Sequence, residues 1–287
     1  MPLKKNNFLA ANFKHFQTIF LYYNSKETEM KILELTFKGK DSVNYENEIE
    51  VPDYIADLIK DLQKQKKPDD KLFSVDSGDV TQFLKNSGNK DLSPKQFRTA
   101  IASKLLVEEL LAMNVEKSWP EWKKVDAFNK ANLAVAKKLN HQKNVGKNHD
   151  DQQKKMSETI QLQTEKLKEK KDAAKTKIAE LKEKIKKTDD KEKKTVLKNK
   201  IKLLQSRLEA AEERLEKAKN KKSFKENTKN FSLGTSKSAY ATPLIVFSFC
   251  KDVDLNPAKI YSKSLLEKYD WAKDVDSDYW RNYVKVD

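Results

Sequence analysis

The chain has 287 residues, and its 59 lysines and arginines against 44 acids give a formal net charge of +15. Charged residues make up 36% and hydrophobic residues 37%, which excludes one continuous compact core and predicts a solvated helical or linker segment. The positive balance favours a polyanionic partner such as nucleic acid, because neutralising phosphates releases condensed counterions.

The N-terminal segment, residues 1–30, is left unassigned. Residues 1–26 contain no acid, and Leu9, Phe13, Phe16 and Phe20 fall at helical spacing. An amphipathic helix is therefore expected, either as a transit peptide or as an ordinary docking helix, and an artefactual N-terminus is a third interpretation. Transit peptides are usually rich in arginine, and this segment has none.

The next segment, residues 31–46, alternates between apolar and polar positions. Leu33, Leu35 and Phe37 fall on one face at the period of a half-buried strand. Gly39-Lys40-Asp41-Ser42 is a turn signal, after which the alternation resumes. The pattern predicts a β-hairpin with Lys40 at its tip.

Residues 51–147 are expected to be helical. Ser93 before Pro94 is a typical helix start, a hydroxyl cap followed by proline at the first helical position. The buried stripe of that helix is predicted to be Phe97, Ile101 and Leu105. A further helix is predicted over 126–140, with an inward stripe of Ala131, Val135 and Leu139.

The composition changes after residue 147. Residues 148–230 hold 26 lysines and arginines against 16 acids, a net charge of +10, with no proline or glycine. Two apolar runs with heptad-like spacing flank the polar break at 188–190, and they consist of Ile160, Leu167, Ala174, Ile178, Leu181 and Ile185, then Leu197, Ile201, Leu204, Leu208, Ala211, Leu215 and Ala218. Two such runs predict an antiparallel helical hairpin. One long solvated helix, or disorder, is the alternative.

The last segment, 230–287, is expected to be compact again. Residues 245–249 form an apolar run, and Tyr261 and Trp271 are predicted to lie in the core. The chain is thus divided into an unassigned segment 1–30, a partial core 31–147, a linker 148–229 and a C-terminal domain 230–287.

Several kinds of site are disfavoured by composition. Three histidines and one cysteine, far apart in the sequence, do not make a zinc site, and five glycines do not predict a nucleotide-binding loop. No cofactor and no metal are therefore expected. The lone Cys250 excludes an intrachain disulfide and favours a reducing compartment. No apolar run reaches the roughly 18–20 residues that span a bilayer, so no membrane partner is expected.

Five segments in order carry a resemblance to a known family. Leu233–Tyr240 (LGTSKSAY) resembles the active-site motif of eukaryotic-type IB DNA topoisomerases, in which Ser-Lys-x-x-Tyr ends in the nucleophile. Phe37–Ser42 is similar to the family's lysine hairpin, Lys95–Ser103 to its arginine helix, and Asn129–Lys143 to its histidine segment. Lys259–Ala272 is similar to its tail.

The resemblance implies a fold and an activity. The fold would be mainly α with a small N-terminal β-hairpin or sheet, a tyrosine-recombinase-like catalytic core interrupted by an antiparallel coiled-coil linker. The activity would be that of an isomerase that relaxes supercoiled duplex DNA by cleaving and rejoining one strand through a 3′-phosphotyrosyl intermediate. Neither ATP nor a metal would be needed. A nuclear location is implied, and a mitochondrial one is the alternative.

The same resemblance assigns roles to particular residues. Tyr240 would be the nucleophile, and Arg98 and His141 would donate to the non-bridging phosphate oxygens. Lys40 would be the general acid that protonates the leaving 5′-oxygen. From the residues alone, a salt bridge is the other interpretation of Arg98. The expected DNA-binding residues are Thr235, Ser236, Lys237 and Lys143.

Two departures from the family leave other functions open. No arginine precedes Arg98, although the family has a catalytic arginine upstream of the lysine hairpin, and the family's large clamp is not found. The chain is therefore expected to be either a truncated product or the smaller subunit of a split enzyme, with a second polypeptide supplying the missing parts. A DNA-binding relic without activity is another alternative, and a basic coiled-coil scaffold is a third.

Overall fold

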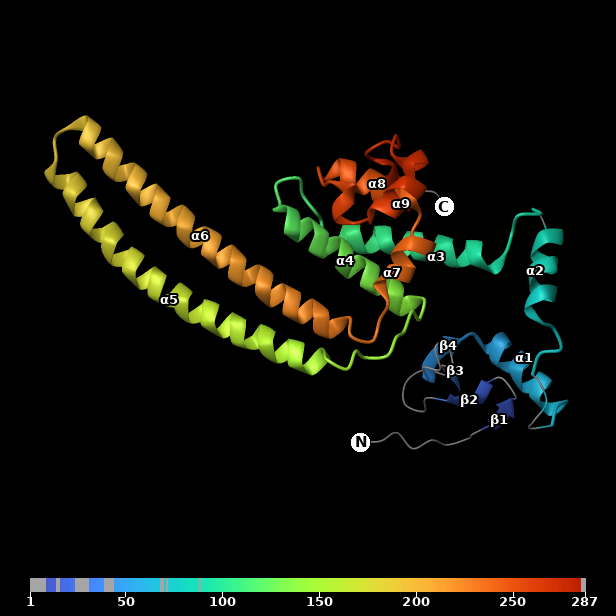
Figure 1. Cartoon of the computed structure of the whole chain (residues 1–287). Coiled ribbons are helices and arrows are strands. Elements are labelled where there is room, and N and C mark those ends of the chain that lie inside the picture. The colour runs from blue at the N-terminus through green and yellow to red at the C-terminus, as the bar shows by residue number, and fades with distance from the viewer. Residues whose placement is uncertain are drawn as a thin grey trace. The chain divides into compact units, whose positions relative to one another are not determined.

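The structure, a computed structural model, describes residues 9–13, 16–23, 31–38, 44–67, 70, 72–87 and 89–284. It divides into two compact units, Met1–Ala100 and Ile101–Asp287, and each is considered by itself (Figure 1). The four segments predicted from the sequence, with boundaries at residues 30, 147 and 229, do not correspond to these two units, and that division stays a prediction. No helix in the described ranges is long and apolar enough to cross a membrane.

The first unit contains a four-stranded antiparallel sheet in the order β1-β2-β3-β4. Its strands are β1 Leu9–Phe13, β2 Phe16–Tyr23, β3 Lys31–Lys38 and β4 Asn44–Val51. The β3–β4 pairing runs in continuous register from Lys31 opposite Val51 to Lys38 opposite Asn44. The predicted hairpin over 31–46 is confirmed by this pairing, and Lys40, the residue predicted for its tip, lies outside the described residues.

The prediction of a helix near the N-terminus is wrong, because that part of the chain forms strands β1 and β2. The stretch Phe16–Tyr23 is rich in aromatic and β-branched residues, which favour strands. Its ladder partner is β3, paired from Thr18 opposite Thr36 to Tyr23 opposite Lys31. The pairing with β3, together with this local composition, therefore decides the structure here, and the 3-4 spacing of the apolar residues does not.

A small core joins strand β3 to the helix that follows the sheet. Leu33 and Leu35 of β3 pack with Ala56 and Ile59 of helix α1 (Asp53–Lys64). Lys31 donates a hydrogen bond to Asp57 at 3.1 Å, which raises the pKa of this lysine. Helix α2 (Ser77–Asn86) follows and begins with a capping box, in which the Asp76 carboxylate accepts from the Gly78 and Asp79 amides.

Helix α3 spans Pro94–Ala112, which confirms the predicted start at Ser93-Pro94. The predicted buried stripe is wrong: Phe97 is 51% exposed and Ile101 is 49% exposed, while only Leu105 packs partly on the core. The buried face instead consists of Ala102, Ser103, Leu106, Val107 and Leu110. Apolar residues occur on more than one face of α3, so their spacing alone does not decide which face is covered.

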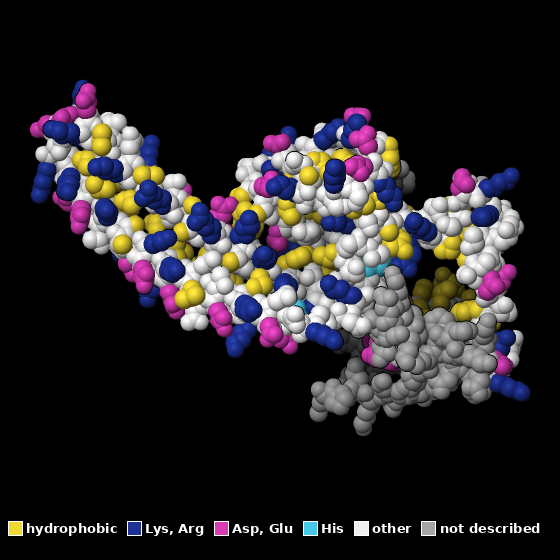
Figure 2. All heavy atoms as spheres, viewed as in Figure 1, with side chains coloured by type: hydrophobic (Ala, Val, Ile, Leu, Met, Phe, Trp, Pro, Cys, Tyr) yellow, Lys and Arg dark blue, Asp and Glu magenta, His cyan; other side chains and the backbone are white. Residues whose placement is uncertain are grey.

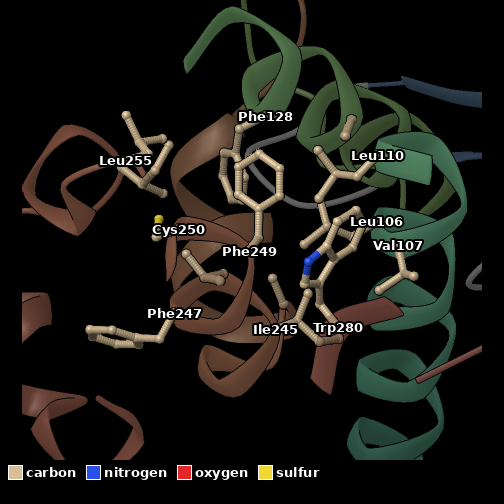
Figure 3. Packing of buried hydrophobic residues seen from close by; sticks show 14 of the residues in the cluster. Leu106, Val107, Leu110, Phe128, Ile245, Phe247, Phe249, Cys250, Leu255 and Trp280 are labelled. Atoms are coloured by element: carbon tan, nitrogen blue, oxygen red, sulfur yellow. The ribbon is translucent and has the colours of Figure 1, made fainter. Parts of the chain in front are cut away.

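The core of the second unit joins α3 to α4 (Glu121–Lys138) and α8 (Pro243–Asp252). The α8 ring of Phe249 lies 6.0 Å from the ring of Phe128 and 5.5 Å, edge-on, from the ring of Trp280 (Figure 3). All three side chains are fully buried. These aromatic contacts between segments far apart in sequence therefore hold α8 on α4 and the Trp280 segment on α8, and the aliphatic Leu106 and Leu110 of α3 belong to the same core.

Four short helices complete this core, namely η3 Pro257–Lys259, α9 Lys263–Lys268, η4 Asp270–Ala272 and α10 Tyr279–Asn282. Tyr261 is buried, as predicted. Trp271 is not, since 65% of it is exposed, and its neighbour Ala272 takes the buried position. In a one-turn helix, adjacent residues point in different directions, so the large ring does not have to point inward.

Between the two halves of this core lies a hairpin of long helices, α5 His149–Lys187 and α6 Lys191–Asn227 (Figure 1). Lys171 pairs with Glu212 at 2.6 Å and His149 with Glu226 at 2.8 Å, so the helices run antiparallel. The most buried seam residues are Leu167, Ala174, Leu181 and Leu215, all predicted. The prediction of two antiparallel helices is confirmed, and the alternative of one long helix is wrong.

Candidate active site

The segment that carries Tyr240 is a turn of unusual geometry. After the short helix α7 (Leu233–Thr235), residues Ser236–Tyr240 form a π-helical turn, η2, closed by the Ala241 amide donating to the Ser236 carbonyl at 2.9 Å. Pro243 at the start of α8 forces its predecessor out of helical geometry. Single π-turns are frequent at functional sites, because they present one side chain outside the regular helical pattern.

His141 is aimed by the way α4 ends. Asn140 adopts a left-handed φ of 55° directly after the last helical residues. Its amide donates to the Lys137 carbonyl at 3.1 Å, and the His141 amide donates to Ala136 at 2.8 Å. These two bonds are the Schellman termination of a helix, and asparagine tolerates the left-handed conformation better than most residues.

A short antiparallel ladder then joins the His141 segment to the segment before the Tyr240 turn. The Ser232 amide donates to the His141 carbonyl at 2.7 Å, and the Lys143 amide donates to Asn230 at 2.9 Å. Gln142 and Phe231 form the bridge between these bonds. The ladder closes the base of the long hairpin, so the two segments lie side by side although α5 and α6 separate them in sequence.

The consequence is direct contact between the two candidate side chains. The rings of His141 and Tyr240 are stacked, with centroids 5.1 Å apart and planes inclined by 29°. Tyr240 is half-buried and packs against the main core. The histidine and the tyrosine that the motifs single out, far apart in sequence, therefore lie in contact.

Buried polar side chains hold the Tyr240 turn from several sides. The Ser103 hydroxyl of α3 accepts from the Thr242 amide at 3.2 Å, and Asn132 of α4 donates to the Leu233 carbonyl at 3.0 Å. The Tyr269 hydroxyl donates to the Ser238 carbonyl. Ser103 and Asn132 are at most 1% exposed. These supporting residues were not predicted from the sequence. The signal that could have found Ser103 and Asn132 is a polar residue among the apolar positions of a buried helix face.

The predicted DNA-binding residues of the turn itself differ in accessibility. Thr235 and Lys237 are half-buried, whereas Ser236 is fully buried and its hydroxyl donates to the Leu233 carbonyl at 3.1 Å. The Lys237 ammonium donates to the Ile260 carbonyl at 2.6 Å, and burial lowers its pKa. Direct DNA contact by these residues stays a prediction.

Lys143 lies at the base of the hairpin, where a polar pocket of about 360 Å³ opens. Three further lysines line it, Lys147, Lys225 and Lys229, together with His149. The pKa of Glu226, which contacts this group, is held low by Lys229 first and by His149 second. The surplus of lysine makes the pocket suited to an anion such as a phosphate.

The remaining two candidates lie elsewhere in the chain. Arg98 is an exposed residue of α3 and belongs to the first compact unit, whereas His141 and Tyr240 belong to the second. Lys40 is outside the described residues. The structure therefore brings together the histidine and the tyrosine of the predicted site, and the assignment of Arg98 and Lys40 to it stays a prediction.

Comparison with known proteins defines the class. Residues 18–178 match the family described as eukaryotic DNA topoisomerase I, catalytic core, and residues 212–281 match the C-terminal topoisomerase domain. The first match covers more than half of the chain and includes His141, and the second includes Tyr240. The chain belongs to the eukaryotic DNA topoisomerase I family.

Individual relatives agree with this assignment. The chain is 32% identical to DNA topoisomerase 1 alpha of Arabidopsis thaliana over 248 residues, covering 86% of this chain and 26% of the relative. It is 30% identical to DNA topoisomerase 1 of Caenorhabditis elegans over 276 residues, 96% of this chain and 32% of the relative. It is 32% identical to DNA topoisomerase 1 of Homo sapiens over 251 residues, which cover 86% of this chain and 31% of the relative. The chain thus spans about a quarter to a third of the length of these relatives.

Proposed function

We propose that this chain carries the tyrosine end of a type IB DNA topoisomerase, an isomerase that relaxes supercoiled duplex DNA. The observation that carries the proposal is the stacked pair of His141 and Tyr240, 5.1 Å apart, within segments that match the family. Tyr240 attacks a phosphodiester, the 5′-oxygen leaves, and a 3′-phosphotyrosyl bond conserves the energy of the broken one. Rejoining is the reverse attack, so neither ATP nor a metal is required.

The other residues of the proposed site stabilise the phosphate or move a proton. His141 donates an N–H to a non-bridging oxygen, and Arg98 supplies a planar cation to the same phosphate, where charge accumulates in the transition state. Lys40 gives its proton to the leaving oxygen. Thr235, Lys237 and Lys143 hold the DNA around the scissile bond, and Ser236, whose side chain is fully buried, contributes to DNA binding by shaping the turn.

The proposed architecture follows the family as well. We infer a tyrosine-recombinase-like core over 31–147, a coiled-coil linker over 148–229 and a C-terminal domain over 230–287. The basic hairpin supports the linker assignment, because its net charge of +10 over 148–230 suits a surface beside DNA. A nuclear location is proposed from the family resemblance, with a mitochondrial one as the alternative.

A second candidate is a DNA-binding function that needs further polypeptide for cleavage. The supporting observation is that residues 1–97 contain no arginine, whereas the family uses one upstream of the lysine hairpin. Lysine replaces the charge of that residue but not its bidentate geometry. In this case a clamp-bearing segment, in the same polypeptide or in a second one, completes the site.

A nicked suicide DNA substrate, incubated without metal or ATP, tests both candidates. We expect the chain to form a covalent protein–DNA band that Tyr240→Phe abolishes. The matched control is Tyr54→Phe, which removes the hydroxyl of an exposed tyrosine in α1 and should leave the band unchanged.

The other outcomes are equally informative. A band that persists in Tyr240→Phe contradicts the assignment of the nucleophile. A wild-type chain that binds the substrate without forming the band supports the second candidate, and the band should then appear when the clamp region of a relative is added. Absence of DNA binding would reject both.

A further inference from the structure

A groove lies between α5 and α6, part-way along the hairpin and outside the Tyr240 site. Its volume is about 510 Å³. Its floor consists of four alanines and two leucines: Ala173, Ala174, Leu204, Leu208, Ala210 and Ala211. Figure 2 shows hydrophobic side chains along the hairpin, with lysines and arginines beside them.

The groove exists because alanines replace larger residues on both helices. Ala174 and Ala211 occupy seam positions at which leucines would fill the space between the helices, and the exposed Ala173 and Ala210 lie beside them in the sequence. Leu204 and Leu208 consequently stay half-buried, although they belong to the apolar seam. Covering accessible apolar surface of this kind with a partner removes it from water, which lowers the free energy of the complex.

Two rows of cations line the groove, Lys170 and Lys177 on α5 and Arg207 and Arg214 on α6. Within each row the residues are seven apart, which is about 10 Å along a helix. Among the described residues, none of the four has an acidic partner, whereas the neighbouring Lys171 is paired with Glu212 at 2.6 Å. The groove therefore combines an apolar floor with cations that are available to a ligand.

Two of these cations are arginines, and this narrows the range of ligands that the groove could bind. Lysine is by far the commoner base in this chain, and the only arginines in the hairpin are Arg207 and Arg214. Guanidinium groups bind carboxylates in a bidentate, planar geometry that an ammonium cannot match. Their presence on one side of the groove favours an anionic partner held in a defined orientation.

Possible occupants differ in how many of these features they use. Duplex DNA would bind the cations through its phosphates, but it has no apolar side chains that could pack on the floor of alanines and leucines. A second copy of the hairpin would bring together two surfaces that each carry a net +10 over 148–230, which is repulsive. An acidic amphipathic helix satisfies both the floor and the cations.

We propose that this hairpin groove docks an acidic amphipathic helix from a partner protein. Its apolar side chains lie on the alanine floor, and its aspartates or glutamates, at seven-residue spacing, pair with the two rows of cations. The result is a local three-helix arrangement. The inference does not depend on the proposed cleavage chemistry, because no residue of the groove belongs to the Tyr240 site.

The probe for the test is a synthetic helical peptide of about four heptads, with leucine at a and d and glutamate at e and g. Binding of the labelled peptide to the full chain is followed by fluorescence anisotropy at low and high salt. A peptide of identical composition, scrambled to remove the apolar stripe, is the reference. We expect the patterned peptide to bind at least about tenfold more tightly, and to keep part of its affinity when salt screens the charges.

Substitutions in the chain locate the binding. Lys170→Glu with Lys177→Glu should weaken the patterned peptide about tenfold, through repulsion of its glutamates. The matched control is Lys168→Glu with Lys175→Glu, on the same helix at the same spacing and outside the groove, and it should change affinity by no more than about twofold. Ala210→Trp, which fills the groove without a charge change, should also weaken binding.

Several results would overturn the proposal. Equal binding of the scrambled peptide, or equal loss in the control pair, would mean that the hairpin attracts any polyanion. Duplex DNA that loses affinity only with the groove variants would assign the groove to DNA. A dimer in sedimentation that Ala210→Trp dissociates would assign it to a second copy. Helicity by circular dichroism checks each variant, and the peptide comparison on the wild-type chain stands without them.

Discussion

The core around Tyr240 and the α5–α6 hairpin belong to one compact unit, yet they are stabilised in different ways. In the core, segments far apart in sequence meet in fully buried contacts, such as Phe249 with Phe128 and Trp280. In the hairpin, the seam buries only a few residues, and leucines such as Leu204 and Leu208 stay half-buried. The core therefore depends on non-local packing, and the hairpin on local helical periodicity.

This difference bears on function. The Tyr240 turn is held by Ser103, Asn132 and Tyr269, which come from three separate elements, so its geometry is over-determined. The nucleophilic role proposed for Tyr240 would need such positioning, because small displacements are costly to reaction rate. The hairpin has no comparable buried polar network among the described residues and retains accessible apolar surface, which suits binding rather than catalysis.

The largest difference in stability between the two regions is expected from truncating one apolar side chain in each. Phe249→Ala should destabilise the core by about 3–5 kcal/mol, because it leaves a cavity beside two aromatic rings. Leu204→Ala in the hairpin should cost only about 1 kcal/mol, since the site is already open to solvent. Native-state hydrogen exchange measures each region separately. Equal effects would show that the two regions unfold as one body.

Cysteine reactivity sharpens the same contrast. Burial raises the pKa of the Cys250 thiol from 9.0 to about 12, so the thiolate fraction at pH 8 falls by about a thousandfold. Alkylation of the native chain should be slower by at least that factor than alkylation in urea, and should accelerate as pH rises toward 12. A cysteine placed at the exposed Ser206 of α6 should react at the rate of a free thiol. Fast native labelling of Cys250 would mean that the core opens readily.

A smaller effect is expected at the end of α4. Asn140→Ala should cost about 1–2 kcal/mol, because the left-handed conformation is unfavourable for alanine. Asn140→Gly is the matched control and should be close to neutral. Thermal unfolding gives the cost, and DNA cleavage assays show whether misplacing His141 lowers the rate more than the loss of stability explains. Identical behaviour of the two variants would argue against the helix termination as the device that aims His141.

The smallest effect is expected for the exposed ion pair of the hairpin. A double-mutant cycle on Lys171 and Glu212 should give a coupling of about 0.2–1 kcal/mol that diminishes as salt increases. A coupling several times larger, or one insensitive to salt, would show that the hairpin is stabilised by specific contacts in the way that the core is.

Much of the hairpin and half of the candidate site were predictable from sequence. The seam residues, the break at 188–190 and the helix start at Pro94 all follow from local signals, because each is decided within a few residues of chain. Tyr240 and His141 were singled out as candidates from motifs, and the structure places their rings in contact, while their roles stay predictions. The stripe of α3, the burial of Trp271 and strands β1 and β2 were predicted wrongly, since each depends on what a distant segment covers.

The amino-acid sequence by itself determined the family, the basic charge, the antiparallel hairpin and the candidate nucleophile, because periodicity, composition and short motifs are local properties of the chain. Only the tertiary structure decided that His141 stacks on Tyr240, that Ser103 and Asn132 support the turn, and that alanines open a groove between α5 and α6. The physical reason is the same in each case. Packing and hydrogen bonding between residues many positions apart select one arrangement among several that local pattern allows.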